Sequence, residues 1–287
     1  MIDEGSQIYV LDRINSAVTV FDSTGAIVAT FGGDGDGPLE FRLPVAFDLL
    51  EDGTLVIEEL GGALKTFSRS EAGFDFRARI PIGSFARDMC ALDNRVFAES
   101  GYPSYEGLLA EYAPEDAGEP LRSFGEGYAY GTELLRMQMN HGSLACLPGP
   151  GRVAFGFRAM PRVDLYSAAG KLLWTAGITD YVQGWTVETP QQDAGAAVST
   201  PDFPKEWLVG LRPVAGDHIV AVYRRQMSAM SDREFRTYLI DSATGWGALV
   251  GDLLEPVAAI GGSIYVTVPS GPFPRLRVWR MREESTG

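Results

Sequence analysis

The feature that most constrains the fold is a repeated series of short apolar runs. Each unit holds four such runs over about 40 to 50 residues, with Gly and Asp turns between them. The series "SLACLPGPG", "RVAFGFRAM", "RVDLYSAAG", "LLWTAG" returns later as "WLVGLRPVAGD", "HIVAVYRR", "FRTYLIDSATG", "WGALVGD". Alternation within "SAVTVFD" is typical of strands, and only residues 132–139 are expected to form one or two helical turns. Repeated four-strand units in an all-β chain predict a β-propeller.

The runs divide into six units. Four strands each are expected from residues 40–83, 84–125, 142–177 and 206–252. Residues 7–32 supply three strands without an inner one, and residues 255–282 supply three without an outer one. The sequence therefore predicts one domain over residues 1–287, a six-bladed β-propeller whose first blade lacks its inner strand. Because unpaired strand edges pair readily with another chain, a homodimer through those edges is one expected arrangement, and an N-terminal truncation would explain the missing strand.

Two segments near the start resemble a known family. "IYVLDRINSAVTVFDSTG" and "GDGPLEFRLPVAFDLLEDGTLVI" resemble NHL-type repeats, with matches at the I-Y-V-x-D run of residues 8–12 and at Gly37, Phe41, Pro44, Asp52 and Gly53. The resemblance covers the whole chain as weak repeats and is strongest near its start. It implies a six-bladed propeller. Since members of that family usually continue upstream, it also implies a periplasmic or secreted parent protein.

The Gly-rich segment "FGGDGDGPLEFRLP" (residues 31–44) can be interpreted as a calcium loop, a phosphate cradle or a turn. An EF-hand loop needs a Glu at position 12 and helices on both sides, whereas position 12 counted from Asp34 is Val45 and strands flank the segment. A P-loop needs Gly-Lys-Ser/Thr, which is absent. The glycines are therefore expected to supply turns with positive φ, with an incidental calcium site as the alternative.

Composition excludes several classes of partner. The net charge of −14 argues against nucleic acid, which needs a basic footprint. No run of about 18 apolar residues is present, so no membrane-spanning helix is expected. The acidic N-terminus "MIDEGSQIYVLD" is not a signal peptide. Cys90 and Cys146 lie in short apolar runs and are expected to be buried, inert thiols.

Three strand starts are similar to those of propeller hydrolases of the gluconolactonase and paraoxonase type. They are "ARDMCALDNRVF", "MNHGSLACLPGPG" and "LEPVAAIGG". The resemblance implies calcium held at the channel mouth by Asp88, Asn140 and Glu255, since hard oxygen ligands suit this ion. His141, between Asn140 and Gly142, departs from the pattern. Polar residues that merely cap strand starts are the alternative.

The same resemblance directs attention to polar residues where inner strands start and where the next strands end. Those residues are Arg42, Arg87, Asp88, Asn140, His141, Lys205 and Glu255, with Asp12, Glu58, Glu99, Arg158 and Arg224. His141 is of the side-chain type that titrates near neutral pH and suits a general base. Arg42, Arg87 and Lys205 are expected either to attract an anion or to form ordinary salt pairs. Zinc chemistry needs three protein ligands, and the chain has only two His.

Two connections, residues 126–141 and 178–206, exceed the usual length of a loop. Their aromatic residues are expected either to roof the channel mouth or to pack on their own loops. The substrate-binding residues predicted here are Tyr128, Tyr130, Tyr181, Trp185, Lys205 and Arg224.

Two functional hypotheses follow. One is a hydrolase of small esters, lactones or phosphotriesters, with His141, Asp88, Arg42 and Arg87 as catalytic residues. The other is a non-catalytic propeller that binds a peptide, glycan or protein. A small-molecule ligand is expected, with no nucleic acid and no membrane. G-x-S-x-G is absent, so no serine nucleophile is expected.

Overall fold

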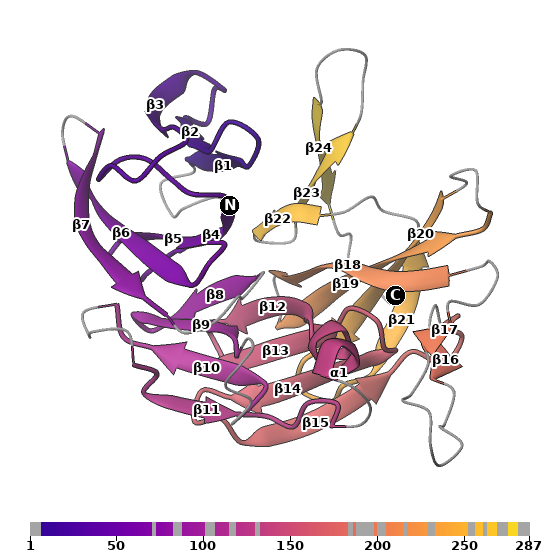
Figure 1. Cartoon of the computed structure of the whole chain (residues 1–287). Coiled ribbons are helices and arrows are strands. Elements are labelled where there is room, and N and C mark those ends of the chain that lie inside the picture. The colour runs from indigo at the N-terminus through magenta and orange to yellow at the C-terminus, as the bar shows by residue number, and fades with distance from the viewer. Residues whose placement is uncertain are drawn as a thin grey trace. The chain divides into compact units, whose positions relative to one another are not determined.

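The computed structural model describes residues 7–70, 73–82, 88–100, 107–114, 119–129, 133–182, 186–187, 198–199, 205–214, 217–228, 233–251, 256–260, 263–268 and 275–280. Within these ranges the chain forms 24 β-strands and one short helix (Figure 1). It divides into two compact units, residues 1–126 with 168–171 and residues 127–167 with 172–287. Each unit is described by itself below.

Unit 1 holds three antiparallel sheets. The first is β1 (Ile8–Asp12), β2 (Ala17–Phe21) and β3 (Ile27–Gly32). The second is β4 (Pro44–Leu49), β5 (Leu55–Glu59), β6 (Ala63–Ser70) and β7 (Gly73–Pro81). The third is β8 (Met89–Leu92), β9 (Arg95–Glu99), β10 (Leu109–Tyr112) and β11 (Arg122–Phe124). In each sheet the strands pair in chain order, as in a propeller blade.

Unit 2 holds the helix and the remaining strands. α1 (Glu133–Met139) precedes a sheet of β12 (Gly142–Leu147), β13 (Arg152–Phe157), β14 (Arg162–Ser167) and β15 (Leu172–Gly177). A two-stranded hairpin of β16 (Thr186–Val187) and β17 (Val198–Ser199) follows. The next sheet is β18 (Lys205–Val214), β19 (His218–Gln226), β20 (Arg233–Asp241) and β21 (Gly247–Gly251). The last is β22 (Pro256–Ile260), β23 (Ser263–Val268) and β24 (Arg275–Arg280).

The predicted six-bladed propeller is wrong. In the described residues four sheets have the four strands of a complete blade, and the first and last sheets have three each. Without the separate hairpin β16–β17, these sheets together are two strands short of six complete blades, and their strands are enough for five. The fold is all-β, and its strands support a five-bladed rather than a six-bladed propeller. The expectation of a short helix near residues 132–139 is confirmed by α1.

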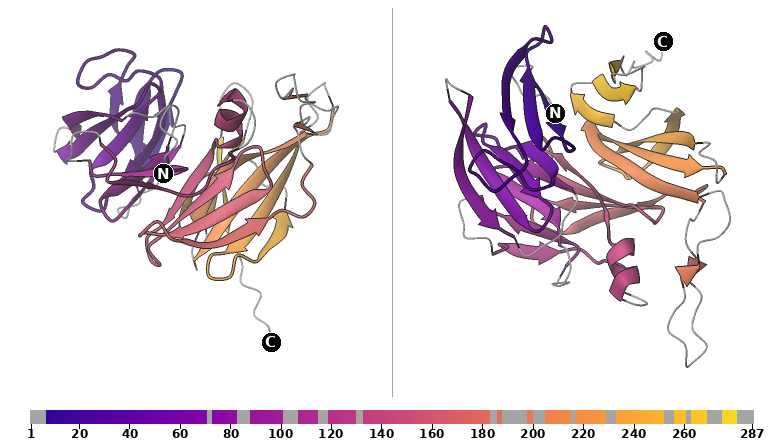
Figure 2. Two further views of the ribbon diagram at one scale, coloured as in Figure 1. Left: turned by 60° about the horizontal axis from the view of Figure 1, so that its bottom comes forward. Right: turned by 45° about the horizontal axis from the view of Figure 1, so that its top comes forward.

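Apolar side chains on the alternating faces of the strands build the cores. In unit 1, Phe31, Phe41 and Phe67 bring three β-segments together, with ring centroids 5.4 to 5.8 Å apart. In unit 2, the sheets β12–β15 and β18–β21 lie side by side in both views of Figure 2. Leu165 and Tyr223 belong to one buried cluster between these sheets. Burial of this apolar area stabilises each unit at about 25 cal/mol per Å².

The Gly-rich segment is a turn, as predicted. Gly32 has φ of 118°, and a Cβ there would lie 2.5 Å from the carbonyl oxygen of Ser16, so only glycine fits. The Glu40 carboxylate accepts the Gly37 N–H at 2.8 Å. Lys65 Nζ donates to the Gly37 carbonyl at 3.0 Å and to the Glu40 carbonyl. The segment is therefore held by its own side chains and by one buried lysine.

The cysteines differ from expectation. Cys90 and Cys146 are both buried, but both are disulfide-bonded and neither is a free thiol. The prediction of two inert thiols is therefore wrong. Short apolar runs indicate burial correctly, but the partner of a sulfur depends on the folded chain. A separate finding is that no helix in the described part of the chain has the length and hydropathy to cross a membrane.

Candidate functional site

Three carboxyl groups of unit 1 lie at or next to strand ends and interact electrostatically. Glu58 is the penultimate residue of β5, Glu99 is the last residue of β9, and Asp88 directly precedes β8. Met89 pairs with Ala98 in the antiparallel ladder of β8 and β9. Asp88 and Glu99 are the next residues along these two strands, so their positions face each other just beyond that pair. We call these three residues the carboxyl cluster.

Glu58 is the central member of the carboxyl cluster. Its side chain is 0% exposed, and neither Oε1 nor Oε2 has a hydrogen-bond partner among the residues that the structure describes. Burial raises the pKa of its carboxyl well above the ordinary value, and the negative charges of Glu99 and Asp88 raise it further. The group is therefore a buried acid that holds its proton more tightly than an exposed glutamate does.

The adjacent residue shows how the chain treats a buried carboxylate that serves structure. Glu59 is 2% exposed, and its Oε1 lies 3.4 Å from Lys65 Nζ and accepts the Arg42 N–H at 2.9 Å. Its Oε2 accepts from Arg79 Nε at 3.1 Å. Because a buried carboxylate without such partners is costly, the missing partners of Glu58 call for an explanation.

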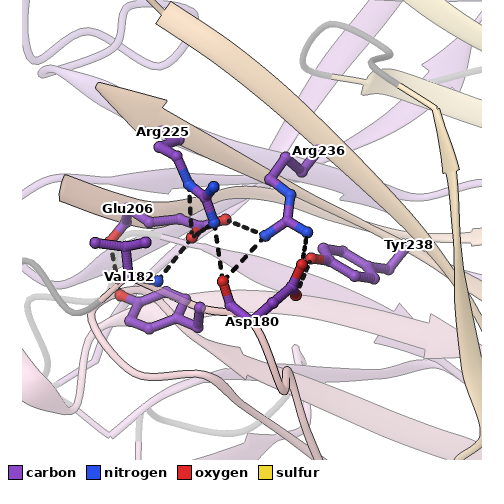
Figure 3. A network of polar contacts seen from close by, with 7 residues as sticks. Asp180, Val182, Glu206, Arg225, Arg236 and Tyr238 are labelled. Carbon is purple, nitrogen blue, oxygen red and sulfur yellow. Dashed lines mark hydrogen bonds and ion pairs between the residues drawn. The ribbon is translucent and has the colours of Figure 1, made fainter. Parts of the chain in front are cut away.

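A second buried carboxylate, in unit 2, is paired with arginine (Figure 3). Glu206 Oε2 accepts from Arg225 and from the Val182 N–H, both at 2.9 Å, and Oε1 lies 3.5 Å from Arg236. Arg236 also pairs with Asp180, whose Oδ1 accepts the hydroxyl of Tyr238 at 2.9 Å. This network ties residues 180–182 to β18–β20, which is a structural role.

The predicted metal ligands do not form one set in the structure. Asp88 is half-buried in unit 1, Asn140 belongs to unit 2, and Glu255 lies outside the described residues. Asn140 Oδ1 accepts the Tyr128 N–H at 2.5 Å, and Nδ2 donates to the Tyr128 carbonyl at 3.1 Å. Among the described residues, no three His, Cys, Asp or Glu side chains are grouped as a metal site.

The predicted catalytic residues are also dispersed. Arg42 is exposed and pairs with Asp36 in unit 1, which is the salt-pair alternative to an anion funnel. His141 is half-buried in unit 2, and its carbonyl accepts the Arg158 N–H at 2.8 Å. Arg87 lies outside the described residues. Of the four, only Asp88 belongs to the carboxyl cluster.

The predicted substrate-binding residues fall into three groups. Tyr130 and Trp185 lie outside the described residues. Tyr181 donates its hydroxyl to the Glu206 carbonyl at 2.6 Å and packs on Tyr223, while Tyr128 packs beside the α1 residues Leu135 and Met139. Lys205 and Arg224 come together on adjacent strands of one sheet.

Sequence reasoning noted Glu58 and Glu99 only as polar ends of strands. The signal that singles out Glu58 is a Glu pair, "EE", at the end of an otherwise apolar strand, "LVIEE". All five residues of that strand are buried, so both carboxylates enter the interior. Sequence alone does not show which of the two meets a cation, because Lys65 and Arg79 come from other strands.

Solved structures with a similar fold identify the architecture. The Cps50 (Swd1) β-propeller domain of Myceliophteria thermophila is 8% identical, with 98% of this chain and 99% of that chain covered and a TM-score of 0.50. The fold is a β-propeller. A DUF4221 family member from Bacteroides vulgatus is 8% identical, with 98% and 92% covered and a TM-score of 0.59. A putative exported protein from Bacteroides fragilis is 14% identical, with 93% and 77% covered and a TM-score of 0.54.

At these identities the likeness shows the fold alone. No family model matches the propeller chain, and no curated protein matches it either. The resemblance to NHL repeats and to gluconolactonase-type propellers is therefore not shown. The carboxyl cluster is therefore the feature that can indicate a function.

Proposed function

We propose that this propeller binds a positively charged ligand at the carboxyl cluster of Glu58, Glu99 and Asp88. The observation that supports the proposal is the Glu58 carboxyl, which is fully buried with both oxygens unpartnered. A cation placed against these oxygens would supply the missing interaction and would offset the mutual repulsion of the three groups.

The other buried carboxylates of the chain support a functional rather than a structural role for Glu58. Glu59, Asp164 and Glu206 each have an Arg or Lys partner within 3.5 Å. The chain therefore neutralises buried acids where they serve stability. A group that departs from this pattern and has a perturbed pKa is a candidate for a binding or catalytic site.

The chemistry of the cluster fits either a hard divalent ion or an organic cation. Carboxylate oxygens are ligands that calcium prefers, and they also accept from ammonium or guanidinium groups. Of the residues predicted for calcium, Asp88 lies in the cluster, while the side chain of Asn140 is engaged with the backbone of Tyr128. Because no three acidic side chains in the described residues are grouped as a metal site, the proposal favours an ammonium or guanidinium ligand, and calcium is the other arm of the test.

Calorimetric titration of the full chain tests the proposal. Calcium chloride and magnesium chloride form one arm, and methylammonium and methylguanidinium the other. We expect saturable binding in one arm, weakened at least about tenfold in Glu58→Gln and Asp88→Asn, because each change removes a negative charge facing the ligand. Glu51→Gln, at an exposed turn, is the matched control and should bind as the wild type does. Wild-type protein that binds neither class would overturn the proposal.

A hydrolase of small esters, lactones or phosphotriesters is the second candidate. The observation that favours it is the raised pKa of Glu58 beside the Asp88 carboxyl, since an acid that keeps its proton next to a second carboxyl group suits general acid–base catalysis. Turnover of an aryl ester, a lactone and a phosphotriester, abolished by Glu58→Gln and unchanged in Glu51→Gln, would support this candidate. Turnover that Glu58→Gln leaves intact would exclude the cluster as its site.

A further inference from the structure

Unit 2 has basic residues at strand positions like those that carry the carboxyl cluster in unit 1. Arg158 directly follows β13, and Arg224 lies two residues before the end of β19. Each is at the end of the second strand of its sheet, as Glu58 and Glu99 are in unit 1. The charge at this strand position is therefore negative in one unit and positive in the other.

Backbone hydrogen bonds join the sheet that contains Arg158 to the sheet that contains Arg224. The Arg158 N–H donates to the His141 carbonyl at 2.8 Å, and the Leu208 N–H donates to the Arg158 carbonyl at 2.9 Å. These two bonds place the end of β13 beside the start of β12 and beside the first residues of β18. The backbone of Arg158, an exposed residue, is therefore hydrogen-bonded to Leu208, which directly follows Trp207.

The ladder between β18 and β19 fixes which side chains share a face. Lys205 pairs with Gln226 and Trp207 pairs with Arg224, so these four side chains lie on one face, while Glu206 and Arg225 lie on the other. The Arg224 guanidinium carbon lies 4.5 Å from the centroid of the Trp207 ring. We call Lys205, Trp207 and Arg224 the Trp207 platform.

The Trp207 indole presents a donor that the fold leaves unused. Its Nε1 atom is buried and has no hydrogen-bond acceptor in the described part of the chain. Tyrosine and tryptophan polar groups usually find a partner when they are buried, because an unsatisfied donor is unfavourable. An oxygen acceptor bound beside Arg224 would satisfy this N–H.

We propose that the Trp207 platform binds a small oxyanion, a carboxylate or a phosphate. The anion's oxygen accepts from Trp207 Nε1, and the Arg224 guanidinium, which lies over the same ring, stabilises its charge. This proposal does not depend on the carboxyl cluster, which is a separate site for a ligand of opposite charge.

Titration of the full chain with inorganic phosphate in one arm and benzoate in the other tests the proposal, by calorimetry and by indole fluorescence. We expect saturable binding of at least one anion. Arg224→Gln should weaken it at least about tenfold through loss of a charged donor, and Trp207→Phe about three- to tenfold, because phenylalanine keeps a ring and removes the N–H. Circular dichroism establishes that both variants are folded, and the arm that binds identifies the anion.

Arg233→Gln is the control, because Arg233 is exposed at the start of β20 and its loss removes the same charge from the same sheet. It should change the affinity less than twofold. Wild-type protein that binds neither phosphate nor benzoate would overturn the proposal. Equal weakening by Arg233→Gln and Arg224→Gln would overturn it too, since that result indicates unspecific attraction to net charge.

Discussion

Lys65 Nζ lies 3.4 Å from Glu59 Oε1, with both side chains almost wholly buried. The same ammonium group donates to the carbonyls of Gly37 and Glu40, so one lysine neutralises a buried acid and holds the Gly-rich turn. Removal of one partner of a buried pair typically costs 3–5 kcal/mol, and loss of Lys65 would leave Glu59 paired with the more exposed Arg79. The pair therefore provides a direct test of how unit 1 is held together.

Lys65→Met should lower the free energy of unfolding by about 3–5 kcal/mol. Methionine fills a similar volume, so the loss reports on the Glu59 charge and the two carbonyls rather than on a cavity. Urea unfolding followed by circular dichroism measures it. Lys171→Met, at an exposed position, should change stability by less than about 0.5 kcal/mol. A Lys65→Met protein as stable as the control would contradict the structural role given to Lys65.

Glu58→Gln should make the protein more stable, with an effect that depends on pH. Burial, together with Glu99 and Asp88, raises the pKa of Glu58 in the folded state above its unfolded value near 4.5. The folded state therefore binds more protons than the unfolded state, and wild-type stability falls as the pH rises from about 4.5 through the folded pKa. Glutamine does not titrate, so the variant is spared this loss.

The expected gain for Glu58→Gln is about 1–3 kcal/mol near pH 7 and close to zero at pH 4, where wild-type Glu58 is protonated in both states. Urea unfolding at the two pH values, without added ligand, measures the difference. A gain of the same size at both pH values would show that titration of Glu58 is not its cause.

Tyr223 and Tyr238 should respond in opposite ways to loss of the hydroxyl. Tyr223 is fully buried and its hydroxyl has no partner among the described residues, so Tyr223→Phe should leave stability unchanged or raise it by about 1 kcal/mol. Tyr238 donates to Asp180 Oδ1 at 2.9 Å, so Tyr238→Phe should cost about 1 kcal/mol. Thermal unfolding of the two variants side by side makes the comparison. A larger loss in Tyr223→Phe would mean that its hydroxyl has a partner in solution.

Asn140→Ala distinguishes a structural amide from a calcium ligand. The Asn140 side chain makes two hydrogen bonds to the backbone of Tyr128, and their loss should lower stability by about 1–2 kcal/mol. The loss should be equal with calcium and with chelator, because both amide groups already have partners. A loss seen only with calcium present would restore Asn140 to the set of metal ligands.

Much of the fold follows from the sequence because strand alternation is local. Alternation within "SAVTVFD" predicts a strand, and its Val18 and Val20 are both buried in β2. The number of blades did not follow, because it depends on how the three-stranded first and last sheets are completed, which no local pattern records. The prediction that Cys90 and Cys146 are free thiols was wrong for the same reason, because disulfide bonding also depends on the folded chain.

The sequence predicted only part of the candidate site. Asp88 and the strand-end residues Glu58 and Glu99 were noted as polar positions, but nothing in the chain order shows that Glu59 receives two cations and Glu58 none. Partners in these networks are far apart in sequence, as Asp180 and Arg236 are. Which acid is left unpaired is decided only when the strands assemble.

Calorimetric titration of wild-type and Glu58→Gln protein with calcium and with methylguanidinium at one pH decides whether the carboxyl cluster is a cation site. We expect saturable binding of one of these cations to the wild type and a loss of at least about tenfold in the variant. Equal affinity in the two proteins, or no binding by the wild type, would contradict the assignment of the carboxyl cluster as a cation site.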